Sequence, residues 1–501
     1  MNAHRHRRHR AAKKARFQKR NEGNVTHLKL IEAINLGKSN RLAEAQKTLK
    51  KVLRKDPQNI QALEEQSRNY MKQGKVDKAE ASLNKILSIK PEHYEALRLL
   101  GVCLRRQGNV SAAITVLRRA IGLRNQEPDA YYSLANILRE NGDIDGALVQ
   151  YYAALAQKED FSPALKGIAL TKTFERKDHD YERLMKFNDI LVSTQYKPIE
   201  KMDISYALGK VHADLGDIDE SFKHYQRANT LKRKSYYRYD LKRDLKQIKS
   251  IAEYFDDYRL NILDGNGHHS AQPIFVLGMP QSGTRIIEDI LCKNDDIKTI
   301  GESGIFYDAV REVLGEDFGP SFNFDTEKRI KGRDLKALAD AYLRRLPEDV
   351  RTAKHVINAM PFNFKWLGLI MLAFPNAKII HTTRNAIDTC FDIYTSMHNA
   401  NLPWLYDQKE LGRMYIAYDE VMQHWQSIAP KRIFTVDYDT LLADPATEIS
   451  EMMDFCAIEN GRVDEHNITP ISTGSWADYA EHLKPIRRIL DEAYGTDEEA
   501  A

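Results

Sequence analysis

The sequence predicts two kinds of fold in one chain, an N-terminal α-helical superhelix followed by a P-loop-like, doubly wound parallel α/β domain. Two observations carry this prediction. Small and apolar residues recur every 34 positions between residues 26 and 161, as they do in stacked helical pairs. A continuous apolar run, "PIFVLG", then leads into a glycine loop and a helix at residues 273–291, which is typical of a buried parallel strand before a phosphate-binding turn.

Length and composition set the outer limits. At 501 residues the chain is too long to fold around a single hydrophobic core, so we expect at least two domains. Its content of 42% hydrophobic and 29% charged residues is that of an ordinary globular protein. No apolar run reaches the ~18 residues that cross a bilayer, and no apolar segment follows the basic start. We therefore expect a cytoplasmic protein without a membrane span. The cysteines lack CxxC spacing, which favours buried thiols over disulfides or a zinc site: Cys103, Cys292, Cys390 and Cys456.

The two ends of the chain differ in charge. Nine of the positive charges lie in residues 1–20, which contain no acid, so the net charge of +4 becomes −5 without them. The composition of residues 1–25 predicts a basic disordered tail, and that of residues 493–501 predicts a short acidic tail. This basic tail could contact the phosphates of nucleic acid non-specifically. Specific binding of nucleic acid is not expected, because no recognisable nucleic-acid-binding module accompanies the tail. Nothing in the sequence calls for a metal.

Four helical repeats are expected over residues 26–161. Small residues lie 34 positions apart at Ala45, Ala79, Ala113 and Ala147. Large side chains follow one helical turn later, on the same face, at Leu49, Leu83, Leu117 and Tyr151. Turn glycines precede the alanines by five residues at Gly74, Gly108 and Gly142. This pattern resembles the tetratricopeptide repeat; it weakens over residues 162–201 and returns over residues 202–240.

Stacked helical pairs present a concave wall. Such a wall binds a peptide or a protein partner, or docks a neighbouring domain of its own chain; a spacer or dimerisation arm is the alternative. Residues 241–271 predict a helix and a linker, which puts the domain boundary near residue 271 and the α/β domain at residues 272–492.

The loop "GMPQSGTR" excludes one large class of enzymes. Gly278 and Gly283 have the spacing of an ATP- or GTP-binding loop. Thr284, however, stands where that loop carries lysine, and Arg285 stands where it carries the magnesium-binding hydroxyl. A nucleoside triphosphatase is therefore not expected, and the loop should bind a phosphate group without a metal.

The same stretch resembles the 5′-phosphosulfate loop of the sulfotransferases, in the branch that carries tetratricopeptide repeats and has a domain like that of the tyrosylprotein sulfotransferases. The resemblance continues through "TIGESGIF", "INAMPFNFKWLGLIMLAFPNAKIIHTTRNAIDTCFDIY", "FTVDYDTLLADP" and "STGSWADYAEHLKPI". It implies 3′-phosphoadenosine 5′-phosphosulfate (PAPS) as co-substrate, no metal, and transfer of a sulfuryl group to a hydroxyl or amine of a peptide or other acceptor presented by the repeats.

The resemblance also implies roles for individual residues. Glu302 matches a catalytic base, which would deprotonate the acceptor. The cofactor-binding positions are Gln281, Ser282, Gly283, Thr284, Arg285 and Arg384. Arg384 matches the arginine that grips the 3′-phosphate; a salt bridge is its structural alternative. Tyr438 and Trp476 fall near the adenine pocket and closing loop of the family, where packing is the favoured role, and His381 is expected to be a core histidine.

Several functional positions depart from the family pattern. Gln281 replaces the loop cation, Ala359 replaces a second lysine, and Asp392 replaces a serine that should face the 3′-phosphate. Ser472 and Asp437 replace arginines. Because juxtaposed like charges cost several kcal/mol, these changes put PAPS binding and turnover in doubt.

Two functions therefore compete. The first is a divergent PAPS-dependent sulfotransferase, in which Arg285 substitutes for the lost cations; Arg285→Ala should then abolish PAPS binding. The second is a catalytically impaired pseudo-sulfotransferase that works as a protein-binding scaffold through its repeats.

Overall fold

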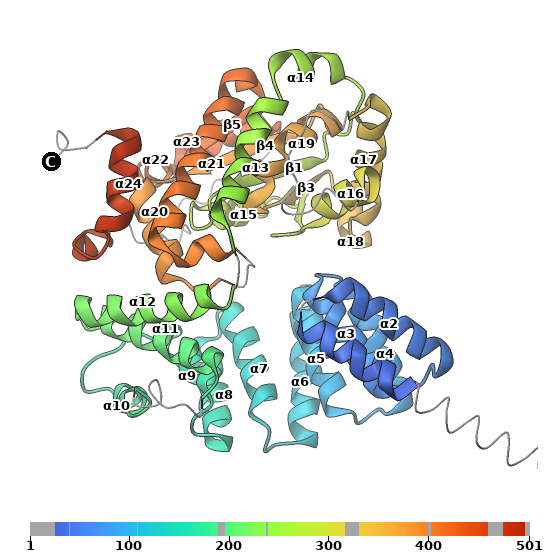
Figure 1. Ribbon diagram of the computed structural model, residues 1–501, viewed down its shortest axis with the longest axis vertical. Helices are drawn as coiled ribbons and strands as arrows, with labels where there is room; N and C mark the ends of the chain where they lie inside the picture. Colours follow the sequence, from blue (N-terminus) through green and yellow to red (C-terminus); the bar gives the residue numbers. More distant parts are fainter. Residues whose placement is uncertain are drawn as a thin grey trace, which may run out of the picture. The chain divides into compact units, whose positions relative to one another are not determined.

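The computed structural model describes residues 26–39, 41–107, 109–188, 196–236, 239–315, 330–398, 402–458 and 474–495 (Figure 1). The expected tails, apart from residues 493–495, and the positions Gly108 and Ser472 lie outside this description. The chain forms two compact units, residues 1–196 and 197–501. Within the described ranges, no helix has both the length and the apolar character needed to cross a bilayer.

The first unit consists of helices packed in successive antiparallel pairs. After a helix over residues 26–38 come α2 (Leu42–Lys55), α3 (Ile60–Lys72), α4 (Val76–Ile89), α5 (Tyr94–Arg106), α6 (Val110–Leu123), α7 (Pro128–Glu140), α8 (Ile144–Gln157), α9 (Ser162–Ala169) and α10 (His179–Lys186). The eight repeated small and large positions are all fully buried. A methyl group on Gly101 would lie 2.6 Å from Leu117, so the helices touch at these positions. The helical superhelix predicted for the first half is confirmed.

The second unit begins with a further helical pair. It contains α11 (Pro198–Asp214), α12 (Ile218–Lys234), α13 (Leu241–Tyr254) and α14 (Asp257–Leu263). Gly209 repeats the close approach seen in the first unit, since a methyl group there would lie 2.8 Å from the Tyr225 ring. The pair α11 and α12 belongs to the same compact unit as the α/β domain.

Within the described residues, five parallel strands form the sheet, in the order β2-β3-β1-β4-β5. They are β1 (Pro273–Gly278), β2 (Ile297–Thr299), β3 (His355–Asn358), β4 (Lys378–Thr383) and β5 (Ile433–Asp437). Phe275 of β1 lies beside Asn358 of β3 and Ile379 of β4. The strand order reverses at β1, and ligands of open parallel sheets bind outside the carboxyl ends of the strands at such a switch point. The parallel α/β domain predicted from "PIFVLG" is confirmed.

Alternate residues of β1 enter different cores, as the period of a strand requires. Helices cover both faces of the sheet: α15 (Thr284–Leu291), α16 (Ile305–Leu314), α17 (Gly332–Arg345), α18 (Glu348–Arg351), α19 (Leu367–Ala373), α20 (Ala386–Thr395), α21 (Gln408–Ile428), α22 (Tyr438–Ala443), α23 (Pro445–Cys456) and α24 (Lys484–Tyr494). Ile274 and Val276 pack with α15 and α23, whereas Phe275 and Leu277 pack with α13, α16, α17, α19 and α21. Short 3-10 helices are η2 (Pro361–Trp366), η3 (Pro403–Tyr406), η4 (Pro430–Arg432) and η6 (Ala477–Tyr479).

Helix α12 is joined to the α/β domain by buried contacts. The Asn229 amide donates to the Tyr394 carbonyl at the end of α20 (2.8 Å) and accepts from the Tyr206 hydroxyl (2.5 Å). Phe222 stacks on His482, with ring centroids 4.6 Å apart. Arg233 pairs in bidentate fashion with Glu410, at 2.8 and 2.7 Å. The contact between Asn229 and Tyr394 fixes α12 against α20 (Ala386–Thr395), the helix that carries part of the site described next.

Candidate anion-binding site

The loop after β1 is shaped by close contacts of its main chain. A methyl group on Gly278 would lie 2.6 Å from the Ser282 hydroxyl and from both oxygens of Thr382. The Ser282 hydroxyl donates to the Met279 carbonyl (2.7 Å) and lies 2.7 Å from the Thr382 hydroxyl. Gln281 and Gly283 both have left-handed backbones, with φ of 67° and 99°. A left-handed backbone is unusual for glutamine, so the surrounding contacts hold this turn in its shape.

Within the described part of the chain, this turn leaves main-chain amides without an acceptor at the start of α15. The N–H groups of Ile286 and Ile287 bond back to the Gly283 carbonyl at 2.9 and 3.2 Å. Among the described residues, the N–H groups of Gly283, Thr284 and Arg285 have no protein acceptor. Unpaired amides and the positive end of a helix dipole together form an anion site.

The side chains around the loop supply little positive charge. The Gln281 amide lies 3.4 Å from the Ser396 hydroxyl. Ala359 is buried, and its N–H donates to the Gly301 carbonyl (3.0 Å). The Arg285 side chain is 82% exposed and lies 3.8 Å from the Asp289 carboxylate. The Arg285 side chain therefore extends into solvent beside Asp289 of its own helix.

Arg384 is held by two carboxylates of α20. Its guanidinium, which has no exposed surface, lies 2.5 Å from Asp392 and 3.8 Å from Asp388. The same nitrogen that contacts Asp392 lies 3.4 Å from the Gln281 carbonyl. Asn385 caps α20 by accepting from the N–H groups of Ile387 and Asp388, which sets the helix directly after Arg384. Because Asp388 and Asp392 are four residues apart, they lie on one face of α20 and enclose the arginine together.

Burial has a clear effect on these acids. It raises the pKa of the Asp392 carboxyl, although the hydrogen bond from Arg384 opposes this shift. Burial likewise raises the pKa of the Asp388 carboxyl, which accepts from the Gly474 N–H at 2.9 Å. The Arg384 guanidinium also lies 5.5 Å from the centre of the Tyr438 ring. The arginine is thus enclosed by groups of its own chain.

Glu302 lies on the α15 side of the site. It follows Gly301, whose φ is 59°, just beyond the end of β2. Although the residue is exposed as a whole, loss of solvent around its carboxyl and the nearby Glu288 raise the pKa of Glu302, which Arg285 opposes. Glu288 in turn accepts a short hydrogen bond from the Thr299 hydroxyl. Glu302 therefore belongs to a small acidic group with one exposed arginine.

Other positions singled out in the sequence have structural roles. Asp437 caps α22 through the Thr440 N–H (3.0 Å). His381 lies 2.6 Å from the Tyr418 hydroxyl in the core, and burial lowers its pKa to about 4, so it is a neutral core histidine. Tyr438 is buried, and Trp476 packs on the core with Arg487 5.4 Å from its ring centre.

Two features of the site were missed in the sequence analysis. Thr382 places its buried hydroxyl against Ser282 of the loop, and its position two residues before Arg384 in "HTTR" was the available signal. The salt bridge given as the structural alternative for Arg384 is present, but its partner Asp392 was missed. The spacing of Asp388 and Asp392 on one helix would have indicated it.

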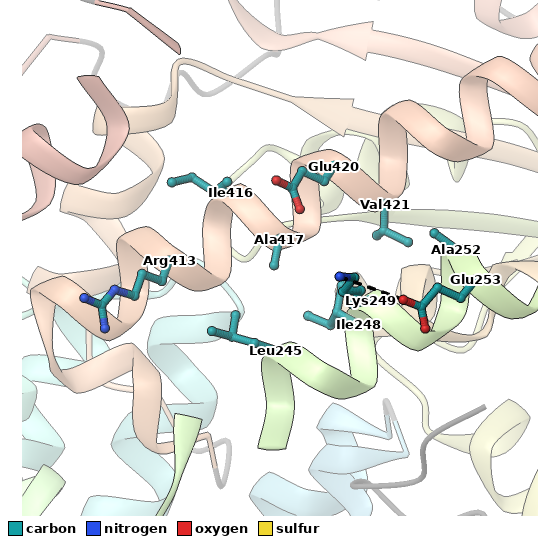
Figure 2. Close-up of a pocket in the computed structure, with 10 residues that line it drawn as sticks. All are labelled: Leu245, Ile248, Lys249, Ala252, Glu253, Arg413, Ile416, Ala417, Glu420 and Val421. Carbon is teal, nitrogen blue, oxygen red and sulfur yellow. Dashed lines mark ion pairs between the residues drawn. The ribbon is translucent and has the colours of Figure 1, made fainter. Parts of the chain in front are cut away.

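A separate groove lies between α13 and α21 (Figure 2). It has a volume of about 570 Å³ and an apolar floor, with the Lys249–Glu253 ion pair (3.9 Å) at its rim. Its lining consists of Leu245, Ile248, Lys249, Ala252, Glu253, Arg413, Ile416, Ala417, Glu420 and Val421. None of these residues belongs to the loop or to the Arg384 cluster, so the groove is distinct from the anion site.

Helical repeats and a parallel sheet with a glycine loop at its switch point define a repeat protein joined to a parallel α/β domain. Residues 273–461 match the model of the sulfotransferase family. Residues 32–89, 65–128, 123–163 and 203–235 match tetratricopeptide repeat models. The chain therefore carries a sulfotransferase-family domain together with tetratricopeptide repeats, as its motifs predicted.

Individual relatives add little about activity. A protein of Aquifex aeolicus (strain VF5), described as an uncharacterized protein, is 28% identical over 362 residues, which cover 66% of this chain and 47% of that protein. The present chain thus spans about half of that relative. Among solved structures, MamA is 23% identical (40% of this chain, 95% of that chain, TM-score 0.26). The type IV pilus biogenesis factor PilW is 20% identical (41% and 93%, TM-score 0.35).

Proposed function

We propose that this protein is a sulfotransferase-like anion-binding protein whose α/β domain retains the phosphate loop but has lost efficient use of PAPS, and whose repeats act as a protein-binding scaffold. The single observation that carries the proposal is the contact between Arg384 and Asp392, at 2.5 Å on a guanidinium without exposed surface. The charge of Arg384, the residue that would bind a 3′-phosphate, is already neutralised by Asp392 of the same chain.

The two ends of PAPS fit the site unequally. The 5′ end suits the loop, because three unpaired amides lie at the start of α15 and such amides favour phosphate. The 3′ end does not suit its position, because a phosphate there would meet the Asp392 carboxylate in front of a buried arginine. Like charges in contact cost several kcal/mol, so PAPS does not fit as a whole.

The chemistry of sulfuryl transfer is also weakened. Charge that develops in such a reaction needs positioned donors, and removing one donor typically costs about a hundredfold to a thousandfold in rate. Gln281 offers only a neutral amide, Ala359 offers no donor from its side chain, and Arg285 is turned to solvent. None of these three positions therefore supplies a positive charge to the phosphate loop.

The repeats supply the second part of the proposal. Tetratricopeptide repeats bind peptides or proteins through the concave wall of stacked helical pairs, and this chain has matching repeats over residues 32–163. We infer a peptide or protein partner for the repeats. The cytoplasmic location expected from the sequence belongs to the same proposal, and it agrees with four free cysteines.

PAPS-dependent transfer is the second candidate function, and one observation favours it. The raised pKa of Glu302 suits a group that must accept a proton near neutral pH. In this candidate, Glu302 would take the proton of an acceptor hydroxyl or amine brought by the repeats.

Calorimetric titration with 3′-phosphoadenosine 5′-phosphate separates the two candidates. We expect no heat from the natural protein at millimolar ligand, and clear binding after the triple change Gln281→Arg, Ala359→Lys and Asp392→Ser. Micromolar binding by the natural protein would support the enzyme instead. Thermal unfolding of both proteins checks that the triple variant is folded.

A further inference from the structure

We infer that the N-terminal end of the repeats is an interface between two copies of this chain, which pair through the helix over residues 26–38 and α2. Leu28 and Ile31 lie on one side of that helix and are 64% and 42% exposed. They line a groove of about 690 Å³ that this helix forms with α2. The inference concerns the first unit alone and is independent of the proposed loss of PAPS use.

The later repeats show what covers this face elsewhere in the chain. The first helices of successive pairs begin at residues 26, 60, 94 and 128. The positions equivalent to Leu28 in the later pairs are therefore Ala62, Ala96 and Ala130, and all three are fully buried. Each belongs to an apolar cluster with the second helix of the preceding pair, which is α2, α4 or α6. The side of the first helix that carries Leu28 is thus a stacking face, on which a further helix packs in every later repeat.

An apolar stacking face at the end of a helical solenoid is unusual. Terminal repeats normally present a polar outer face, whereas this end presents a leucine and an isoleucine. At the other end of the four pairs, α9 packs against α8, so the chain itself covers the last pair. The first pair therefore needs a cover of a different origin.

Charge favours a second copy as that cover. At the rim of the groove Arg41 and Glu44 pair with each other at 2.7 Å. Glu32 on the first helix and Lys47 and Lys51 on α2 also line the groove, and none of the three forms an ion pair with another described residue. In a two-fold interface each patch meets its own counterpart. The glutamate of each copy can then face the lysines of the other, with the apolar side chains between them.

The basic tail of the same chain suits the groove less well. Residues 1–20 carry nine positive charges and no acid, and one glutamate with two lysines makes the unpaired charge of the groove positive as well. Like charges brought together are unfavourable. In addition, Gln18 lies 34 positions before Val52, which is the buried residue that α2 shares with Ala62 in one cluster. The tail therefore lacks an apolar residue where a covering helix needs one.

Sedimentation equilibrium of the full chain at micromolar concentration tests the inference. We expect the natural protein to have twice the mass of one chain. Leu28→Glu should weaken the dimer by about a hundredfold, because a symmetric interface contains the change twice and brings like charges together. Val149→Glu is the matched control, since Val149 of α8 is 60% exposed in the same unit; this variant should remain a dimer.

A charge exchange tests which groups meet. Glu32→Lys should weaken the dimer by about tenfold, because it places like charges opposite each other. Adding Lys47→Glu and Lys51→Glu to the same chain should restore the natural affinity. Such recovery requires that the first helix of one copy faces α2 of the other. Circular dichroism checks that every variant keeps its helical content.

The outcomes are distinct. A natural protein that is monomeric at these concentrations, or a dimer that survives Leu28→Glu, would overturn the inference. In a monomer, resistance of the tail to trypsin would assign the groove to residues 1–20 instead. A charge exchange that does not restore the dimer would contradict the proposed facing of Glu32 and the lysines. Should Leu28→Glu not fold, the mass of the natural protein and the charge exchange decide.

Discussion

The loop at residues 278–285 and the first turns of α20 form two halves of one candidate site, built by different means. The loop is made of main chain: glycines, a left-handed Gln281 and unpaired amides. The α20 half is made of side chains, in which Asp392 and Asp388 hold Arg384. A main-chain site persists as long as the strand, turn and helix persist, whereas one substitution reverses the charge of a side-chain site. Under the proposed function, this difference accounts for a chain that keeps the phosphate loop of its family and no longer uses PAPS efficiently.

The largest effect should come from removing the arginine of the α20 half. Arg384→Met leaves the buried Asp388 and the half-buried Asp392 without their arginine partner, and breaking a buried ion pair costs about 3–5 kcal/mol. Urea unfolding would measure this loss of stability. Arg285→Met is the matched control, because its side chain is 82% exposed; we expect no measurable change. Equal effects of the two changes would contradict the structural role given to the Arg384 cluster.

The main-chain half should be sensitive to a single methyl group. Gly278→Ala would bring the new carbon within 2.6 Å of Thr382 and Ser282, and overpacking of this kind costs about 1–3 kcal/mol. Gly304→Ala is the control, since nothing lies within 4 Å of its added carbon. Denaturant midpoints measure both. Tolerance of Gly278→Ala would mean that the loop is not fixed by these contacts.

His381 lies on β4, the strand that contacts the loop through Thr382 and leads into Arg384 and α20. Its folded-state pKa of about 4 lies below the ordinary 6.5, so the unfolded chain takes up the proton first as the pH falls. The free energy of unfolding should therefore drop by about 2 kcal/mol between about pH 7.5 and about pH 5. Urea titrations at both pH values should show this component in the natural protein and lack it in His381→Gln. A variant with an unchanged pH dependence would argue against a neutral buried His381.

The smallest effect concerns the strain of the loop itself. Gln281 has a φ of 67°, a conformation that costs a non-glycine residue on the order of 1 kcal/mol. Gln281→Gly should therefore raise the free energy of unfolding by up to about 1 kcal/mol. Gln281→Ala, which keeps the strain and loses only the 3.4 Å contact with Ser396, should leave it unchanged. A destabilised glycine variant would show that the side-chain contact matters more than the backbone.

Much of the fold was predictable because it depends on local patterns. The 34-residue spacing of alanines places one buried position per repeat, and "PIFVLG" marks a strand buried on both faces; Ala113 and Phe275 are indeed fully buried. The glycines of the loop were likewise readable, because a phosphate turn requires them at fixed spacing.

The charge pattern of the site was not predictable in the same way. The sequence indicated that Asp392 would face a phosphate, but its rotamer toward Arg384 depends on how α20 follows β4 and on the depth of burial. The direction of Arg285 depends on its pairing with Asp289 one turn later. Long-range contacts such as Asn229 with Tyr394 join residues 165 positions apart, which spacing along the chain does not reveal.

That last contact decides where this chain can be cut. Asn229 donates to the main chain only two residues beyond Asp392, and Phe222 covers His482. A fragment starting at residue 272 would uncover aromatic surface and leave the Tyr394 carbonyl without its donor. We therefore expect the smallest fragment that keeps the sulfotransferase-like domain folded to start near residue 197, so that α11 and α12 remain packed against it.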